Sequence, residues 1–478
     1  MTHKIFSLLY IIAFMLILLI PFAGMALPTA DSLSEKNQEL RAWPDVYSED
    51  STLNVSYPSE MGDYFQDHFA FRDHMIMTNS ILKSLTFKSN AQEQVIMGQD
   101  DWLFFNATTK DYLGRGLLSD RELYSAVHNI SLMKDYIEQN GSKLVFTISP
   151  NKNSLYGQYM PYNYVQSPDS NARNLKPLLM QAGVAYVDLF EAFGAEKEAL
   201  YFKRDSHWNN KGAALAYHTL MDALGKTHQD YRNTAWETRT DHIGDIDEML
   251  FLSSYKKEIQ YYPAEAFEYV YVNDDDVEDD MSSWIETGNE SKKDSLLMYR
   301  DSFGESLVPF FAQAFRNAYF SRLVPYDLTD VAEYQPDYVI IQKVERNLID
   351  FVARSAIVPG MIVNTMSPPK KETNSTIATS TDGPYLVIKG AVDSSCLEDE
   401  SDIFVSIYSE ETKQTKTYKT MYLTNEERDG NGYCLYLDEE SLPSGNLQIQ
   451  LIVSGGIDDS FVVQSEEYIN KSGGDIHE

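Results

Sequence analysis

The chain has 478 residues, which is enough for two or three domains. Apolar residues make up 43% and aromatic residues 13% of the sequence, so the chain can form a folded core and is not disordered as a whole. Its formal net charge of -33 argues against nucleic acid, or an anionic membrane surface, as a partner reached by electrostatic attraction.

The N-terminal segment is strongly apolar. Residues 5–27 carry no charged side chain and are long enough to span a bilayer, which takes about 20 residues. His3 and Lys4 precede them and acidic residues follow, so the remaining chain is expected outside the cytoplasm. Because Gly24-Met25-Ala26 has the spacing of a signal-peptidase site, residues 1–27 are predicted as either a signal anchor in the cell membrane or a cleaved signal peptide of a secreted protein.

The next part of the chain leads toward a folded domain. Residues 28–58, rich in Pro, Ser and acidic residues, predict an extended extracellular stalk. Apolar residues at helical spacing predict a helix from Tyr64 to about Leu85. Val95–Gly98 and Trp102–Phe105, separated by Gln-Asp-Asp, predict a β-hairpin.

From about residue 119 helical and strand-like segments alternate. This alternation predicts a parallel sheet with flanking helices, in one α/β domain over residues 59–365. Residues 255–293, which include an acidic run at 274–280, are expected to form a solvated insertion. The helices are expected over residues 120–139, 172–182, 211–224, 305–315 and 329–334, and the strands over 143–148, 184–189, 296–299, 318–324 and 338–344.

The C-terminal part has a different pattern. Residues 366–382 are rich in Pro, Lys, Ser and Thr and predict a linker. Beyond it, strand-like runs separated by turns predict a small all-β sandwich over residues 383–478. The two cysteines of the chain, Cys396 and Cys434, both lie in this module, and the sequence leaves open whether they pair. The runs are 385–389, 403–408, 417–423, 432–437 and 447–453.

Two polar motifs suggest a catalytic site. Asp205 and His207 stand two positions apart in a short polar loop, and Ser302 ends the apolar run 296–299 and precedes an expected helix. These residue types supply an orienting carboxylate, a general base and a nucleophile, as in serine hydrolases and acyltransferases. The alternative is structural, with Ser302 capping the following helix and Asp205 capping its own loop.

Other residues are assigned to this site by position. In a parallel sheet ligands bind beyond the carboxyl ends of the strands, which selects the loop 149–156. Its amides, Asn151 and Asn153, are candidate oxyanion donors, although turn formation explains both equally well. The backbone N–H of Ser302, at the start of a helix, is a further candidate. Candidate substrate contacts are Tyr156, Trp208 and Arg300, and for Trp208 packing against the imidazole is the alternative.

A metal site is not expected. His207, His218, Asp241 and His242 offer ligand types, but the chain has no HExxH motif. We therefore predict neither a metal nor another cofactor.

The same motifs carry a family resemblance. DSHW at Asp205–Trp208, NxKG at Asn209–Gly212 and RDSF at Arg300–Phe303 resemble the DHHW proteins and the SGNH-hydrolase-like domains of alginate O-acetylation proteins. The resemblance extends from about Tyr64 to Val363. The family is named for the motif DHHW, and this chain has Ser206 in place of the first His of that motif. The Asp and the second His of the motif are present as Asp205 and His207.

This resemblance implies an SGNH-hydrolase-like α/β fold and O-acetylation of an extracellular polysaccharide. It also implies a membrane-bound O-acyltransferase as the partner that supplies the acetyl group. A carbohydrate O-acetylesterase remains an alternative because water and a sugar hydroxyl compete for the same acyl-enzyme. A non-catalytic surface protein that binds glycan is the alternative from another class.

Overall fold

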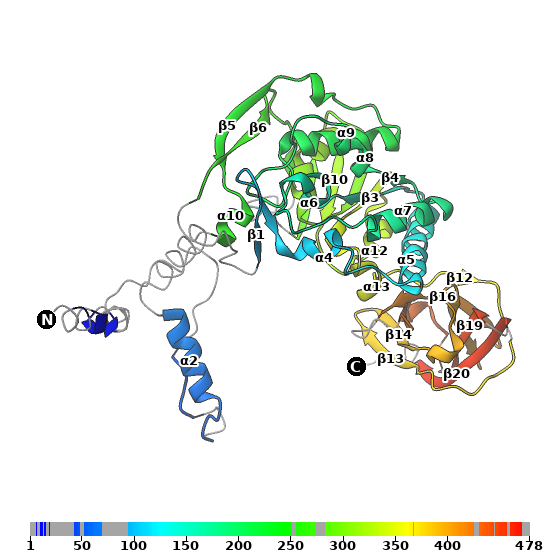
Figure 1. The fold of residues 1–478 in the computed structure, drawn as a ribbon. Helices are drawn as coiled ribbons and strands as arrows, with labels where there is room; N and C mark the ends of the chain where they lie inside the picture. Colours follow the sequence, from blue (N-terminus) through cyan, green and yellow to red (C-terminus); the bar gives the residue numbers. More distant parts are fainter. Residues whose placement is uncertain are drawn as a thin grey trace. The chain divides into compact units, whose positions relative to one another are not determined.

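The computed structural model describes residues 43–47, 52–68, 94–250, 255–272, 283–366, 368–424, 430–443, 445–456 and 459–470, with a few single residues between 6 and 19. It divides into two compact units. One comprises Met1–Val95 and Asp247–Tyr255, and the other Ile96–Ile246 and Lys256–Glu478. The second unit holds both the α/β domain and the C-terminal β module (Figure 1).

In the first unit the main described element is α2 (Tyr57–His68). It begins within the last residues of the predicted stalk and covers the start of the helix expected from Tyr64. The rest of that predicted helix, from residue 69, lies outside the described residues, as does most of the predicted anchor at 1–27. Within the described part of the chain, no helix combines the length and the apolar character needed to cross a bilayer.

The α/β domain is built on a seven-stranded sheet with the order β4-β3-β11-β9-β10-β8-β7. The five strands from β4 to β10 pair in parallel, whereas β8 and β7 pair antiparallel at one edge. β11 is inserted between β3 and β9, so the loops that follow these three strands leave the sheet side by side. The strands are β3 (Lys143–Ser149), β4 (Tyr186–Val187), β7 (Val270–Tyr271), β8 (Trp284–Gly288), β9 (Ser295–Tyr299), β10 (Asn317–Ser321) and β11 (Tyr338–Val344).

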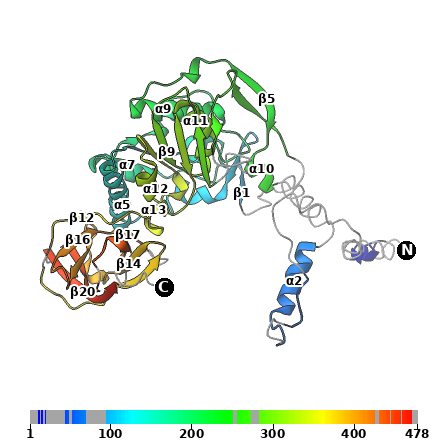
Figure 2. The same cartoon turned by 180° about the vertical axis from the view of Figure 1, so that it is seen from behind.

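Helices cover both faces of this sheet (Figures 1 and 2). Successive side chains of a strand point to opposite faces, so Ile340 packs in one apolar cluster and Ile341 in the other. The Ile340 cluster includes α8 (Leu189–Gly194), α9 (Asn210–Leu224) and α11 (Val308–Ala314). The Ile341 cluster includes α5 (Asp120–Gln139), α7 (Asn171–Gln181), α12 (Thr329–Tyr334) and α13 (Asp350–Ala353).

Several predicted elements are shorter than expected. The strand predicted over 184–189 ends at Val187, because Asp188 caps α8 by accepting a hydrogen bond from the backbone N–H of Glu191. The helix predicted over 305–315 is the 3-10 helix η6 (Ser302–Leu307) followed by α11. Further short helices are η3 (Asn106–Thr108), α4 (Thr109–Tyr112), α6 (Lys152–Leu155), η4 (Gly157–Tyr159), η5 (Tyr231–Asn233), α10 (Asp245–Leu250) and η7 (Glu345–Asn347).

Two hairpins stand apart from the sheet. β1 (Val95–Met97) and β2 (Leu103–Phe105) form the predicted hairpin. A second hairpin, β5 (Trp236–His242) with β6 (Glu258–Pro263), was not predicted. The stretch expected to be a solvated insertion thus contains β6, β7 and β8, and its acidic run at 274–280 lies outside the described residues.

The C-terminal module consists of two antiparallel sheets, with the orders β12-β16-β15-β19-β20 and β13-β14-β18-β17. β13 lies within the predicted linker, and β20 was not predicted. Cys396 and Cys434 are buried and free. The strands are β12 (Ile362–Val363), β13 (Ala378–Asp382), β14 (Tyr385–Ala391), β15 (Asp402–Ser409), β16 (Thr415–Lys419), β17 (Met421–Leu423), β18 (Gly432–Asp438), β19 (Gly445–Gly456) and β20 (Asp459–Asn470), with the 3-10 helices η8 (Ser394–Cys396) and η9 (Glu439–Ser441).

The module is held against α5 by buried hydrogen bonds. Asn129 on α5 donates from Nδ2 to the backbone oxygen of Tyr422 on β17 of the module and to that of Phe351 on α13 of the α/β domain, both at 2.7 Å. Its Oδ1 accepts from the backbone N–H of Tyr422 at 2.8 Å. These three bonds fix the position and the rotation of the Asn129 amide relative to the backbone of the module, so the module is docked on the α/β domain within the larger unit.

Candidate active site

The predicted triad residues come together at the carboxyl edge of the parallel strands. Ser302 follows β9, and Asp205 and His207 lie in the loop that precedes α9. This loop is closed by an antiparallel bridge between Tyr201 and Trp208. Folding thus brings together residues that are 95 positions apart in the chain.

A continuous hydrogen-bond relay joins the three side chains. His207 Nδ1 lies 2.8 Å from Asp205 Oδ1, and His207 Nε2 lies 2.9 Å from Ser302 Oγ. A carboxylate only accepts hydrogen bonds, so Nδ1 carries the proton and donates to Asp205. In the neutral imidazole, Nε2 is then the acceptor for the hydroxyl proton of Ser302, as a general base requires.

Asp205 is buried, with 4% of its surface exposed, and accepts hydrogen bonds at both oxygens. Besides His207 Nδ1, its donors are the backbone N–H of His207 at 2.8 Å, His242 Nε2 at 2.9 Å and the backbone N–H of Asp245 at 3.1 Å. Burial alone would raise the pKa of Asp205, but the bonds from His207 and His242 hold that pKa well below its usual value. The side chain is therefore an ionised carboxylate in the folded protein.

His207 is held as a basic imidazole. Burial opposes its charged form, but the hydrogen bond and the charge of Asp205, together with the charge of Asp245, raise the pKa of His207 above the usual value. Its side chain is 24% exposed, so the imidazole keeps a route to solvent or substrate.

Asp301 sets the position of Ser302. Its Oδ1 accepts from the backbone N–H of Phe303 at 2.9 Å and from Gln342 Nε2 at 2.9 Å, and its Oδ2 accepts from the backbone N–H of Val344 at 2.6 Å. Asp301 is thus the N-cap of η6 and ties the turn to β11. The structural alternative for Ser302 is wrong, because Asp301 provides the cap and the Ser302 hydroxyl bonds to His207 instead.

The predicted oxyanion amides point elsewhere, which corrects that prediction. Asn151 Nδ2 donates to Asp111 Oδ2 at 3.3 Å, and Asn153 Nδ2 faces the backbone oxygen of Thr108 at 3.5 Å. Both Asn side chains are buried. The backbone N–H of Ser302 is different, since it begins η6 and has no acceptor among the described residues. Of the three predicted oxyanion donors, the backbone N–H of Ser302 therefore remains a candidate.

Two predicted substrate contacts are also corrected. Trp208 is 1% exposed and Arg300 0%, so neither presents a surface to a ligand. Trp208 donates from Nε1 to Ser306 Oγ at 2.6 Å and packs edge-on against Phe303, which contacts the His207 ring at 4.7 Å between centroids. This is the packing alternative.

The third predicted contact, Tyr156, is partly buried. Its hydroxyl accepts a hydrogen bond from the backbone N–H of Leu200 at 2.9 Å, and its ring packs against Trp102. No contact between Tyr156 and the triad is found among the described residues. Its predicted role at the substrate stays a prediction.

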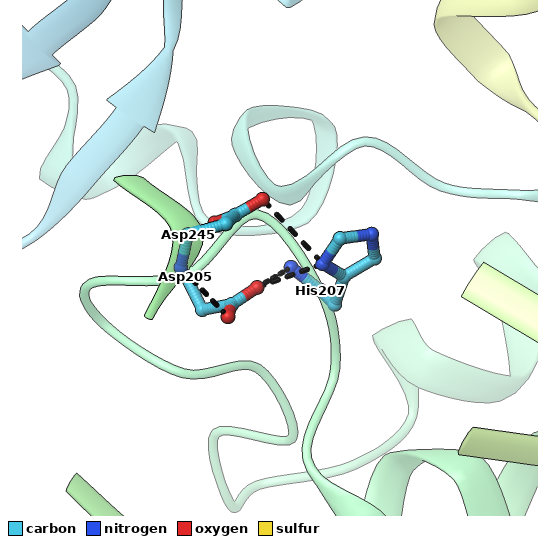
Figure 3. Close-up of side chains that lie close together, drawn as sticks. All are labelled: Asp205, His207 and Asp245. Atoms are coloured by element: carbon cyan, nitrogen blue, oxygen red, sulfur yellow. Dashed lines mark hydrogen bonds and ion pairs between the residues drawn. The ribbon is translucent and has the colours of Figure 1, made fainter. Parts of the chain in front are cut away.

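Sequence reasoning missed Asp245 as part of the site. Its Oδ2 lies 3.6 Å from His207 Nδ1 (Figure 3). Its carboxylate also accepts from the backbone N–H and the hydroxyl of Ser206, at 2.7 and 2.5 Å. Burial, and then the charge of Asp205, raise the pKa of Asp245. No motif marks this residue, because its place depends on the fold of the β5–α10 connection.

Sequence reasoning considered His242 only as a possible metal ligand and missed its bond to Asp205, and it missed Arg346. His242 at the end of β5 bonds to Asp205 and stacks on Phe202 with 3.7 Å between ring centroids. The guanidinium of Arg346, after β11, lies over the rings of Phe105 and Phe303. Its Nη1 is buried without a hydrogen-bond partner among the described residues, and its charge lowers the pKa of His207.

The grouping of Asp205, His207 and Asp245 also has the composition of a cation site, with ligand atoms within 4.8 Å of one another. The lone pairs of Asp205 already accept four N–H groups, and Nδ1 of His207 is one of these donors. This donor set fits a hydrogen-bonded acid–imidazole pair rather than a metal ion. His218, considered as a ligand from the sequence, instead bonds to the backbone N–H of Tyr231 and to His228.

Part of the chain matches a known protein family. Residues 95–290 match the family model described as "SGNH hydrolase-like domain, acetyltransferase AlgX". The predicted family resemblance is thereby confirmed. The match contains Asp205 and His207 and ends before Ser302, and it confirms the SGNH-hydrolase-like α/β fold.

Individual relatives are distant. The probable alginate O-acetylase AlgJ of Pseudomonas syringae pv. tomato is 24% identical over 184 residues, which are 37% of this chain and 45% of that protein. The chain thus spans less than half the length of this relative. Bacillus cereus PatB1 is 17% identical with a TM-score of 0.43, covering 53% of this chain and 96% of that chain. A DHHW family protein from Eubacterium siraeum is 17% identical with a TM-score of 0.38, and the match covers 48% of this chain and 87% of that chain.

Proposed function

We propose that this protein is a serine acyltransferase that O-acetylates a cell-surface polysaccharide outside the cytoplasm. The observation that carries the proposal is the relay from Asp205 through His207 to Ser302, with hydrogen bonds of 2.8 and 2.9 Å. A serine hydroxyl is a weak nucleophile near neutral pH and needs such a base.

The reaction proceeds in two transfers. Ser302 Oγ attacks the carbonyl carbon of the acetyl donor while its proton passes to His207 Nε2. His207 returns this proton to the departing oxygen, which leaves an acetyl-serine. A sugar hydroxyl then gives its proton to Nε2 and attacks the acetyl group, and Ser302 Oγ recovers the proton as it leaves.

The electrostatics of the site suit this sequence. Asp205 stays ionised and stabilises the imidazolium that forms in each transfer. The backbone N–H of Ser302, at the first residue of η6, is available to the oxyanion of each tetrahedral intermediate.

The acetyl group and the polysaccharide are proposed from the relatives. The matched family model is described as an acetyltransferase domain, and the Pseudomonas relative as a probable alginate O-acetylase. The apolar residues 5–27 support attachment to the cell membrane, or secretion after cleavage. We further propose a membrane-bound O-acyltransferase as the acetyl donor, an assignment that rests on the resemblance alone.

Release of nitrophenol from a nitrophenyl acetate tests the catalytic part of the proposal. The Ser302→Ala variant should lose activity by at least 10³-fold, because it lacks the nucleophile. Equal rates for the wild type and this variant would leave only a non-catalytic glycan-binding protein. Supplying an acetyl donor together with a polysaccharide separates transferase from esterase, since only the transferase adds acetyl groups to the polymer.

A further inference from the structure

Lys152 is a buried lysine whose ammonium meets the loop of the proposed site. It is the first residue of α6, directly after β3, and 3% of its surface is exposed. Its Nζ donates to the backbone oxygens of Phe202 at 3.2 Å, Lys203 at 3.0 Å and Asp205 at 2.5 Å. An ammonium group has three N–H donors, and all three are used here.

These bonds bend the loop around a single point. Three carbonyls within four consecutive residues converge on one ammonium, so the backbone leading to Asp205 is curled around Nζ. The rings of Trp102 and Phe104 lie 5.6 and 5.3 Å from Nζ and close the other side. Without the ammonium the oxygens of Phe202 and Asp205 would lose this donor, whereas the oxygen of Lys203 also accepts from the backbone N–H of Leu103 at 2.8 Å.

We propose that Lys152 is a positioning residue that holds the loop 202–205 in the conformation in which Asp205 and His207 face Ser302. This inference rests on the proposed function, because it assigns Lys152 a role in the same acyl-transfer reaction. Lys152 does not contact the reacting atoms. It acts through the backbone that carries Asp205, and Asp205 in turn orients His207. Its charge also favours the ionised form of Asp205, since each group stabilises the charge of the other.

The positioning of the loop 202–205 by Lys152 depends on pH. Burial lowers the pKa of Lys152 to about 8; the charges of Asp205, Asp245 and Glu258 oppose this shift, and Arg204 adds to it. A neutral amine has two donors in place of three and no charge, so above this pH one of the three carbonyls loses its hydrogen bond to Nζ. The positioning effect is therefore complete below the pKa of Lys152 and is lost as the pH rises through it.

Lys152→Met, which keeps the length of the side chain and removes its donors, tests the proposal. Lys143→Met is the matched control, because Lys143 begins β3, the strand that precedes α6, and its Nζ also donates to two backbone oxygens, those of Ala223 and Leu224. We expect kcat/KM for nitrophenyl acetate to fall about 100-fold in Lys152→Met, as for a displaced catalytic group. The control should stay within about twofold of wild type.

The pH profile separates positioning from mere stability. Wild-type kcat/KM should decline above a pH of about 8, and a folded Lys152→Met variant should lack that decline. A folded Lys152→Met variant with wild-type kcat/KM, or a wild-type rate that does not decline at alkaline pH, would overturn the proposal. Thermal unfolding of each variant shows whether it is folded.

Nuclear magnetic resonance of the wild type decides the matter if Lys152→Met does not fold. The ring signals of His207 should change with the same midpoint as the side-chain signal of labelled Lys152, and independent midpoints would refute the inference. Ser302→Ala, assayed in parallel, tests the proposed function separately. If it matches the wild type, the proposed function fails, whereas the His207 signals still report whether Lys152 holds the loop.

Discussion

Replacing Asp205 with Asn tests the central relay at a single functional group. The two side chains have nearly the same shape, but the amide has one acceptor oxygen where the carboxylate has two. In the structure these two oxygens together accept four N–H groups, two of them from backbone. Either orientation of the amide therefore directs its NH2 group at a backbone N–H, and both remove the negative charge beside His207.

The expected loss of activity follows from these contacts. The bond from His207 Nδ1 to the carboxylate, at 2.8 Å, becomes charge-assisted when the imidazolium forms, and such a bond contributes about 3 kcal/mol. At about 1.4 kcal/mol per tenfold in rate, this alone is roughly 100-fold in kcat. An imidazole no longer held by a carboxylate also populates the tautomer with a proton on Nε2, which cannot accept from Ser302. The loss of kcat should therefore lie between about 100-fold and 10⁴-fold.

The pH profile provides an independent readout of the same substitution. With the carboxylate gone, burial and the charge of Arg346 both disfavour the imidazolium, so the pKa of His207 falls. The acidic limb of kcat/KM should move to lower pH. Asp241→Asn is the matched control, because Asp241 is exposed on β5 and accepts a hydrogen bond from Tyr262. An Asp205→Asn variant with kcat within about tenfold of wild type and an unmoved acidic limb would refute the relay.

Three further substitutions probe other parts of the structure. Arg346→Met removes a charge that lowers the pKa of His207, so the acidic limb of kcat/KM should move to higher pH; an unmoved limb would contradict this coupling. Asn129→Ala leaves three buried backbone groups without their partner and should lower the free energy of unfolding by about 3 kcal/mol, measured by chemical denaturation. Gly304→Ala places a Cβ 2.5 Å from Cβ of the buried Arg300, so the turn at Ser302 must shift. We expect kcat to fall about tenfold or more while folding is retained, and a wild-type kcat would show that the turn adapts.

The parallel strands were predictable because their sequences are nearly continuous apolar runs. β3, β9 and β11 are buried on both faces, and the predicted bounds of each agree with the structure to within one residue. Among the strands that were missed, β13 reads Ala-Thr-Ser-Thr-Asp, and β20 contains several acidic residues. Both lie at the edge of a sheet, where one side of the strand has no strand neighbour and little apolar signal is needed.

The candidate triad was predictable for a different reason. Asp205, His207 and Ser302 have the residue types that acyl transfer requires, and their neighbours carry a family resemblance. These three residues could therefore be grouped from the sequence without knowledge of the geometry. The direction of an amide does depend on geometry, which is why loop position suggested an oxyanion role for Asn151 although its donor turns to Asp111.

The groups that orient the relay have partners that no sequence pattern displays. Lys152 binds three backbone oxygens, Asp301 accepts from two backbone N–H groups, and Asp205 accepts from two more. Backbone atoms are the same for every residue type, so a motif cannot reveal which of them converge on a side chain. The alignment of His207 with Ser302 therefore depends on the path of two loops as much as on the three side chains themselves. Substituting Lys152 or Asp301 should impair catalysis while every member of the triad is still present.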